Sequence, residues 1–191
     1  MSRPTISPGR CGNARFRMDA FVPLGRALHQ HHVRYVVMGV WGANYYARSA
    51  STVFTTEDRD LFLPPDADNL VRCWAACEAV GLDLWNGDEP LDSPRDPWLA
   101  ERVIARRAAV NASDQSGLDV DLSLVMAGFD FETVWRERRT FVVDDVEIPV
   151  ARLLHIVQSK HSVGRDKDRL FLATHREALE ELLRREARRS G

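Results

Sequence analysis

Two aspartates, Asp58 and Asp60, open an apolar segment in the stretch TEDRDLFL over residues 56–63. Successive side chains of a β-strand point to opposite faces, so these two carboxylates project from the same face, about 7 Å apart along the strand. Two carboxylates at contact distance repel by roughly 4 kcal/mol at an effective dielectric near 20. A strand that holds such a pair side by side is therefore a candidate cation site.

Two further features of the sequence suit the same site. The stretch LDVDL over residues 118–122 places Asp119 and Asp121 on one face of a second predicted strand. Upstream, the apolar stretch YVVMG over residues 35–39 ends in Gly39, shortly before a predicted helix. A glycine bend lets backbone N–H groups approach a phosphate, and the N-terminus of a helix carries partial positive charge. The sequence thus predicts that acidic side chains from two strands converge beside a glycine bend.

These parts match the needs of nucleotidyl transfer, in which a nucleoside monophosphate moves from an NTP to an acceptor and pyrophosphate leaves. The reactants and the transition state are crowded with negative charge. Mg²⁺ takes oxygen ligands, of which one or two come from carboxylates and the rest from phosphate and water. Two such ions stabilise both the attacking and the leaving oxygen. The sequence therefore predicts Mg²⁺, or Mn²⁺, as the cofactor and an NTP as the substrate.

The order of glycine turn, TxDxD strand, later apolar-Asp-apolar strand and helical tail resembles the minimal nucleotidyltransferases of the polymerase β superfamily. Within that superfamily the sequence is most similar to the AbiEii-type toxin and antibiotic-nucleotidyltransferase branches. The resemblance covers roughly residues 20–180. It includes Lys160 and the run GRDKD over residues 164–168, which is similar to a lysine and an R-x-K-D run that follow the core in AbiEii-like proteins.

The resemblance implies a role for each acidic residue. Asp58 and Asp60 would bind metal, and a third carboxylate would orient and deprotonate the acceptor hydroxyl. Asp121 is preferred for that third role, and as a metal ligand, because the apolar residues behind it fit the family's strand pattern. Asp119 points from the same face and remains an alternative catalytic residue.

The resemblance also implies a nucleotide-binding set on the phosphate side. Gly39 and the adjacent Val40 would contact phosphate, while Lys160 and Arg165 would neutralise the triphosphate. Lys supplies a compact point charge for this purpose, and Arg supplies a fork of donors that matches two phosphate oxygens.

Three features depart from the family pattern. Val40 occupies a position that usually holds a small residue, and Arg59 lies between the two aspartates where an apolar residue is usual. On a strand, Arg59 would face the packed helix layer and need a partner there. The segment between Gly39 and Asp58 is also about four residues longer than in the family. A catalytically degenerate relative, acting as a binding or antitoxin-like module, is therefore the alternative hypothesis.

The composition limits the classes of protein to consider. The chain has 191 residues, of which 45% are hydrophobic and 28% charged, with a formal net charge of −2, which argues against a broad electrostatic grip on nucleic acid. No apolar run is long enough to span a bilayer, so no membrane partner is predicted. The three cysteines show no CxxC spacing, which fits a reducing, cytoplasmic location.

Residues 1–17 are interpreted as a disordered leader, 18–150 as a nucleotidyltransferase-like core and 151–191 as a C-terminal helical segment.

Alternating helices and short strands predict an α+β (or α/β) fold, with a nucleotidyltransferase-type mixed sheet, helices on one face and further helices at the C-terminus. Helices are predicted over 19–32, 41–48, 66–80, 131–138, 151–161 and 165–188. Strands are predicted over 33–39, 60–63, 82–85, 108–112, 118–125 and, as one or two strands, 140–150. Residues 86–97 are predicted to form a loop, and 98–107 either a helix or irregular structure.

The predicted acceptor is a hydroxyl on RNA or tRNA, on a protein or on a small molecule. The resemblance places the enzyme in a toxin–antitoxin pair, with the oligomeric state left open. Trp85 and Trp98 flank the predicted loop and are candidates for contact with a base or with the substrate.

Overall fold

One mixed β-sheet of eight strands organises the part of the chain that the computed structural model describes, which is residues 20–48, 53–56, 58–115 and 117–188. Its strands are β1 (Val36–Met38), β2 (Arg59–Phe62), β3 (Asp83–Asn86), β4 (Glu89–Pro90), β5 (Val110–Ser113), β6 (Asp119–Ser123), β7 (Arg139–Val143) and β8 (Val146–Val150). Their order across the sheet is β4-β3-β5-β6-β2-β1-β8-β7. β2 pairs with β6 and β1 with β8 in parallel, whereas the other neighbours are antiparallel.

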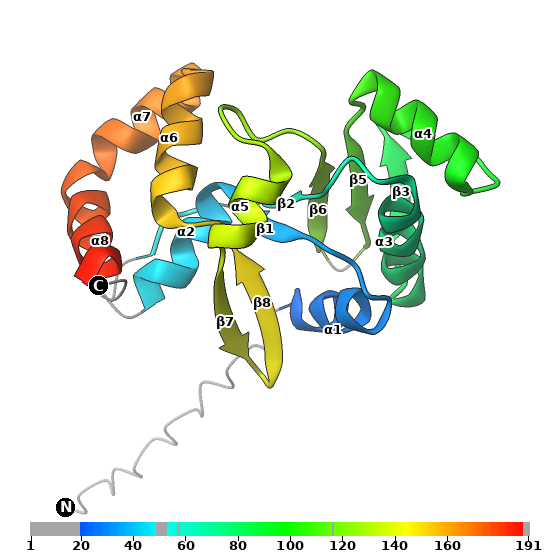
Figure 1. Cartoon of the computed structure of the whole chain (residues 1–191), viewed down its shortest axis with the longest axis horizontal. Helices are drawn as coiled ribbons and strands as arrows, with labels where there is room; N and C mark the ends of the chain where they lie inside the picture. The colour runs from blue at the N-terminus through cyan, green and yellow to red at the C-terminus, as the bar shows by residue number, and fades with distance from the viewer. Residues whose placement is uncertain (1–19, 49–52, 57, 116, 189–191) are drawn as a thin grey trace, which may run out of the picture.

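Eight helices pack around this sheet over the same described residues. They are α1 (Val22–Gln30), α2 (Gly39–Ala47), α3 (Ala67–Ala79), α4 (Pro97–Arg106), α5 (Phe131–Glu137), α6 (Leu153–Val163), α7 (Asp166–Thr174) and α8 (Arg176–Arg188). The predicted α+β class, a mixed sheet with helices on it and more helices at the C-terminal end, is confirmed. α6, α7 and α8 lie at one end of the molecule and α3 and α4 at the other, with β1, β2 and β6 between them (Figure 1).

Local sequence signals explain where α3 begins and ends. Pro64 and Pro65 follow β2 and cannot donate to a strand ladder. The Asp66 carboxylate then accepts the backbone N–H of Asn69 at 2.6 Å, which satisfies one of the free donors of the first helical turn. Gly81 adopts a φ of +83° just past the helix, a conformation that glycine takes without steric cost.

Three segments refine the expectation from sequence. The predicted loop over residues 86–97 contains the end of β3 and the short strand β4. The undecided segment after it is helical, because the Asp96 carboxylate accepts the N–H of Leu99 at 3.0 Å and caps α4. The helix predicted over residues 165–188 is divided into α7 and α8, since His175 leaves the helical conformation between them (φ −107°, ψ 16°).

The expectation that helices lie on one face of the sheet is wrong. Alternate residues of β1 belong to two separate cores: Val37 packs in the cluster that includes α1 and α3, and Val36 in the cluster that includes α5, α6 and α8. β2 behaves in the same way, with Leu61 in the first cluster and Phe62 in the second. A strand covered on both faces can be apolar throughout, so its hydrophobic run does not reveal how many faces are covered.

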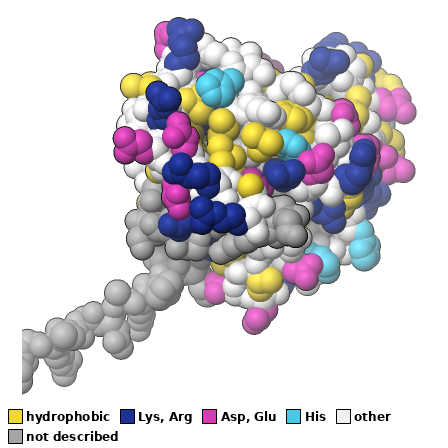
Figure 2. All heavy atoms as spheres, turned by 60° about the vertical axis from the view of Figure 1, so that its left-hand side comes forward, with side chains coloured by type: hydrophobic (Ala, Val, Ile, Leu, Met, Phe, Trp, Pro, Cys, Tyr) yellow, Lys and Arg dark blue, Asp and Glu magenta, His cyan; other side chains and the backbone are white. Residues whose placement is uncertain are grey.

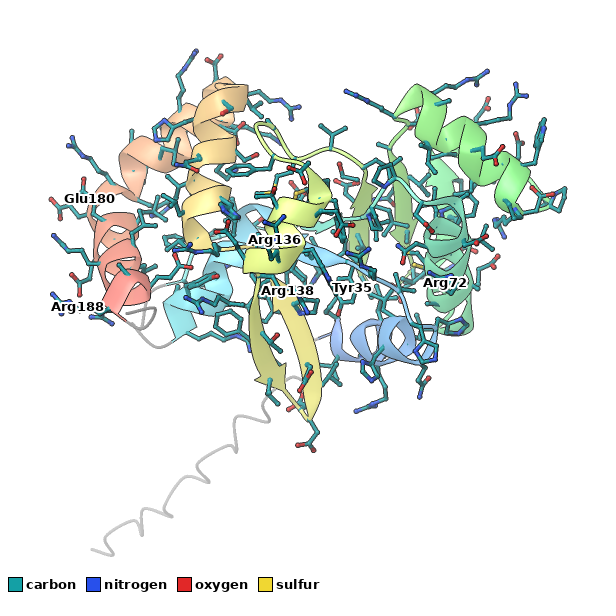
Figure 3. All side chains as sticks on the ribbon, in the orientation of Figure 1. Tyr35, Arg72, Arg136, Arg138, Glu180 and Arg188 are labelled. Atoms are coloured by element: carbon teal, nitrogen blue, oxygen red, sulfur yellow. The ribbon has the colours of Figure 1, made fainter. Side chains whose placement is uncertain are left out.

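The C-terminal helices are part of the second core, since Leu179 and Leu182 of α8 are buried in it. Their outer side is charged, and Figure 2 shows basic and acidic side chains next to one another on that face, with hydrophobic side chains gathered between them. Glu180 and Arg188 lie on the outer side of α8 (Figure 3). The predicted leader falls outside the described residues, and no helix within them is long and apolar enough to cross a membrane.

Candidate active site

The register of two parallel strands brings the two acidic segments together. Asp60 of β2 pairs with Asp121 of β6, so their side chains leave the same face of the sheet on neighbouring strands about 4.8 Å apart. Asp58, immediately before β2, lines the same cavity as these two residues. The structure therefore places Asp58, Asp60 and Asp121 together, as the sequence predicted.

Gly39 touches this acidic cluster directly. Its φ of +67° favours glycine, and a Cβ atom placed on it would lie 2.0 Å from Oδ2 of Asp60. No other residue fits this position without displacing the carboxylate. α2 begins at Gly39, and no described side chain caps its N-terminus. Its first N–H groups and the positive end of its dipole are therefore available to an anion next to Asp60.

A cavity of about 700 Å³ surrounds these residues, a volume typical of small-ligand sites. Apart from Asp119, all the predicted catalytic, metal-binding and nucleotide-binding residues line it: Gly39, Val40, Asp58, Asp60, Asp121, Lys160 and Arg165. Residues of β1, α2, β2, β6, α6 and α7 thus converge on one space, although they are spread over more than 120 positions of the sequence.

Asp119 and Asp121 are both exposed, but only Asp121 lines the cavity. The geometry accordingly favours Asp121 over Asp119 as the third carboxylate. Asn111 of β5, the register partner of Asp121, donates from Nδ2 to Oδ1 of Asp121 at 3.2 Å and also to Oδ1 of Asp119. Sequence reasoning missed Asn111. Its signal was a polar residue between the buried Val110 and Ala112, on the strand predicted to form a hairpin with β6.

Positive side chains from the C-terminal helices contribute another part of the lining. Lys160 of α6, Arg165 immediately before α7 and Lys167 of α7 all line the cavity. Lys167 was not among the predicted site residues. Lys160 Nζ donates to Oδ1 of the buried Asp168 at 2.7 Å and lies 5.1 Å from the centre of the Phe171 ring. Asp168 therefore holds Lys160 in place at the edge of the acidic site.

The environment of Asp60 disfavours its negative charge. Burial, followed by the charges of Asp121 and Asp58, raises the pKa of Asp60 to about 6, and the positive charges of Lys160 and Lys167 oppose this rise. A carboxylate with a raised pKa between two others is stabilised in its ionised form by a cation. Binding of a cation would therefore stabilise the ionised form of Asp60 in this cluster.

The donor set fits Mg²⁺ only as part of a ternary complex. Among the described residues, no three or more His, Cys, Asp or Glu side chains are arranged to hold a metal ion by themselves. Mg²⁺, however, is commonly bound through one or two carboxylates, with phosphate oxygens and waters completing its shell. Asp60 and Asp121, adjacent in register, supply two carboxylates beside the uncapped N-terminus of α2.

The two unusual residues of the motif have different surroundings. Arg59 points away from the aspartates, and its guanidinium carbon lies 5.7 Å from the centre of the Trp41 ring. It therefore finds an aromatic partner in the opposite core, as its position on the strand required, and stays out of the cavity. Val40 lines the cavity at the first turn of α2, where its side chain reduces the room beside the N–H groups.

No family model matches the sequence, and no curated protein matches it. Among solved structures, the chain is similar to the solution structure of the antibiotic-resistance factor ANT(2'')-Ia, described as showing substrate-regulated conformation dynamics. The two are 14% identical, the TM-score is 0.48, and the match covers 88% of this chain and 89% of the other. A similarity at this level assigns neither a family nor an activity to the chain.

Proposed function

We propose that the protein is a Mg²⁺-dependent nucleotidyltransferase that transfers a nucleoside monophosphate from an NTP to a hydroxyl acceptor. One observation supports this above the others. The backbone of Gly39 lies against the Asp60 carboxylate at the start of α2, with Asp121 beside it on the adjacent parallel strand. A phosphate cradle and a pair of carboxylates thus share one cavity with Lys160, Arg165 and Lys167.

The nucleotide is held by its phosphates. The uncapped N–H groups of α2 bind phosphate oxygens, as helix N-termini commonly do. Arg165 and Lys167 add positive charge, and Lys160, oriented by Asp168, provides a fixed point charge. Mg²⁺ or Mn²⁺, bound by Asp58, Asp60 and Asp121 with the phosphates, would neutralise charge on the triphosphate and polarise the α-phosphate.

Asp121 acts on the acceptor. It takes the proton from the acceptor hydroxyl as that oxygen forms a bond to the α-phosphorus. The bond between the α-phosphorus and the bridging oxygen breaks, and pyrophosphate leaves with the electron pair. Asn111 positions Asp121 through its hydrogen bond of 3.2 Å, which fixes the direction in which the carboxylate points.

Isothermal titration with each of the four NTPs tests the first part of this proposal. Wild type is expected to bind at least one NTP in the presence of Mg²⁺ and to bind it at least tenfold more weakly in EDTA. Asp60→Asn and Asp121→Asn should each remove most of the increase in NTP affinity that Mg²⁺ produces. Asp119→Asn is the matched control, because Asp119 is an exposed carboxylate on the same strand and outside the cavity. Equal binding by wild type and both cavity variants would exclude a nucleotide site here.

A binding module without catalysis is the second candidate, favoured by Val40 at the first turn of α2 and by the lack of a preassembled metal cluster among the described residues. The two candidates differ in one measurement. Wild type incubated with α-labelled NTP and total RNA, or with lysate protein, should release pyrophosphate and transfer label, whereas Asp121→Asn should not. Mg²⁺-dependent binding of NTP without any transfer of labelled nucleotide would identify the protein as a non-catalytic binding module.

The toxin–antitoxin setting is the part of the proposal that depends on resemblance alone. It predicts that expression of wild type in a bacterial host arrests growth. Asp121→Asn, expressed to the same level, should not, because arrest would require transfer. Equal growth of cells expressing either protein would remove this setting while leaving the biochemical proposal intact.

A further inference from the structure

The outer face of α4 carries an exposed tryptophan. Trp98 is 62% exposed, while the other four tryptophans, all within the described residues, are buried or half-buried. The helix is anchored by Leu99, Ala100 and Val103, which are buried on its other side. An exposed tryptophan presents a large flat aromatic surface on which another ring can stack.

Arginines extend this exposed face along the helix. The guanidinium carbon of Arg102 lies 4.5 Å from the centre of the Trp98 ring, and Arg106 is exposed one turn further on. The i, i+4, i+8 spacing places the three residues on one side of α4, over about 12 Å of helix. We call Trp98, Arg102 and Arg106 the α4 platform. Figure 3 shows the side chains of α4 projecting outward from the molecule.

The platform leads toward the acidic cavity. α4 ends at Arg106, Arg107 turns the chain with a φ of +48°, and Ala109, just before β5, lines the cavity together with Asp60 and Asp121. α4 and the C-terminal helices lie at opposite ends of the molecule, with the site strands β2 and β6 between them (Figure 1). Arg106, at the C-terminal end of the platform, is therefore three residues from Ala109 of the cavity lining, at the end of the molecule opposite the C-terminal helices (Figure 1).

The positive charge of α4 favours an anionic ligand. The chain has a formal net charge of −2, yet residues 97–107 carry three arginines and one glutamate, which gives +2. A flat aromatic ring paired with a guanidinium suits the stacking of an unpaired base, and the arginines that follow suit its phosphates. A duplex would present no free base face to Trp98.

We propose that the α4 platform binds single-stranded nucleic acid and directs its terminal hydroxyl to Asp121, so that the acceptor of the reaction is a nucleic-acid end. The inference rests on the proposed function for its catalytic part. The binding surface itself depends only on Trp98, Arg102 and Arg106.

Fluorescence anisotropy with a labelled 12-nucleotide single-stranded RNA tests the binding surface. Trp98→Ala should weaken binding by about 5- to 150-fold, the range expected for loss of one base stack. Trp98→Phe should stay within about threefold of wild type, because it keeps an aromatic face. Arg102→Gln/Arg106→Gln should weaken binding and reduce the slope of log K against log [salt] by about 1.4, which corresponds to two phosphate contacts on a single strand. Arg176→Gln/Arg184→Gln is the control, since these arginines lie on α8.

Two further readouts separate this inference from the proposed function. NTP binding in Mg²⁺ should be the same in wild type and in all platform variants, while transfer of labelled nucleotide to the RNA should fall in parallel with RNA binding. A duplex of the same sequence should bind at least tenfold more weakly. Two results would refute nucleic-acid binding by the platform without affecting the proposed nucleotidyltransferase activity. One is RNA binding that does not change in Trp98→Ala, and the other is transfer of label to protein that platform substitutions do not affect. If platform substitutions weaken RNA binding but the protein binds no NTP, the platform is supported as an RNA-binding surface and the proposed function is refuted.

Discussion

Replacing Asp60 with Asn should stabilise the metal-free protein at neutral pH, even though it removes a proposed metal ligand. Asp60 is partly buried, next to Asp121 in register and against the backbone of Gly39. These neighbours raise the pKa of Asp60 to about 6 from an ordinary value of 3.8. Asn has nearly the same shape as the protonated carboxyl group but cannot ionise, so the substitution removes the electrostatic cost and little else.

The size of the effect follows from the two pKa values. They differ by about 2, and one pKa unit corresponds to 1.36 kcal/mol, so ionised Asp60 costs about 3 kcal/mol. Because the folded-state pKa is higher than the unfolded value, the folded state binds more protons between pH 4 and pH 6. The wild type therefore loses this stability as pH rises through that window, and the whole cost is present above pH 7.

Urea denaturation in EDTA, followed by circular dichroism, measures this difference. At pH 7.5, Asp60→Asn should be more stable than wild type by about 2–3 kcal/mol, and the gap should close toward pH 4.5. Asp119→Asn, an exposed carboxylate on β6, should stay within about 0.5 kcal/mol of wild type at both pH values.

Addition of Mg²⁺ and a bound NTP should reverse the order. A ligand at a thousand times its Kd stabilises wild type by about 4.1 kcal/mol, which exceeds the advantage of the Asn variant in the metal-free state, and the Asn variant should gain far less. Two results would refute the conclusion that ionised Asp60 destabilises the metal-free protein. One is an Asp60→Asn protein that is less stable than wild type at pH 7.5, and the other is a difference in the free energy of unfolding that does not depend on pH.

Three other substitutions test separate parts of the site. Gly39→Ala should lower the free energy of unfolding by about 1–3 kcal/mol, because its Cβ meets Asp60 at 2.0 Å and its φ is +67°, and it should abolish Mg²⁺-dependent NTP binding in titration calorimetry. Asp168→Asn should destabilise the protein by about 3 kcal/mol in urea titrations, since it leaves the amino group of Lys160 partly buried without its anionic partner, and Asp168→Glu should recover part of this loss. Asn111→Ala should lower kcat for nucleotide transfer by about tenfold with little change in the KM for NTP, because Asn111 orients Asp121 and does not line the cavity; a change confined to KM would contradict that role.

The sequence alone was sufficient for most of the elements and for part of the site. Helix and strand periodicities, the proline pair after β2 and the glycine after α3 marked most element boundaries, because these signals act within a few residues of the chain. The same local geometry placed Asp58 and Asp60 on one strand face and Gly39 at a bend. What could be predicted was the set of residues that share a face, since alternation along a strand depends on backbone geometry alone.

The tertiary structure decided which residues meet. The parallel register of β2 and β6 put Asp60 beside Asp121, while Asp119, two residues earlier on the same face of β6, lies outside the cavity. Pairing between strands and packing between helices join residues that are far apart in the sequence, and no local pattern encodes those distances. For the same reason the partners of Lys160 and Arg59, which are Asp168 and Trp41, became evident only from the packing of α6 on α7 and of α2 on the sheet.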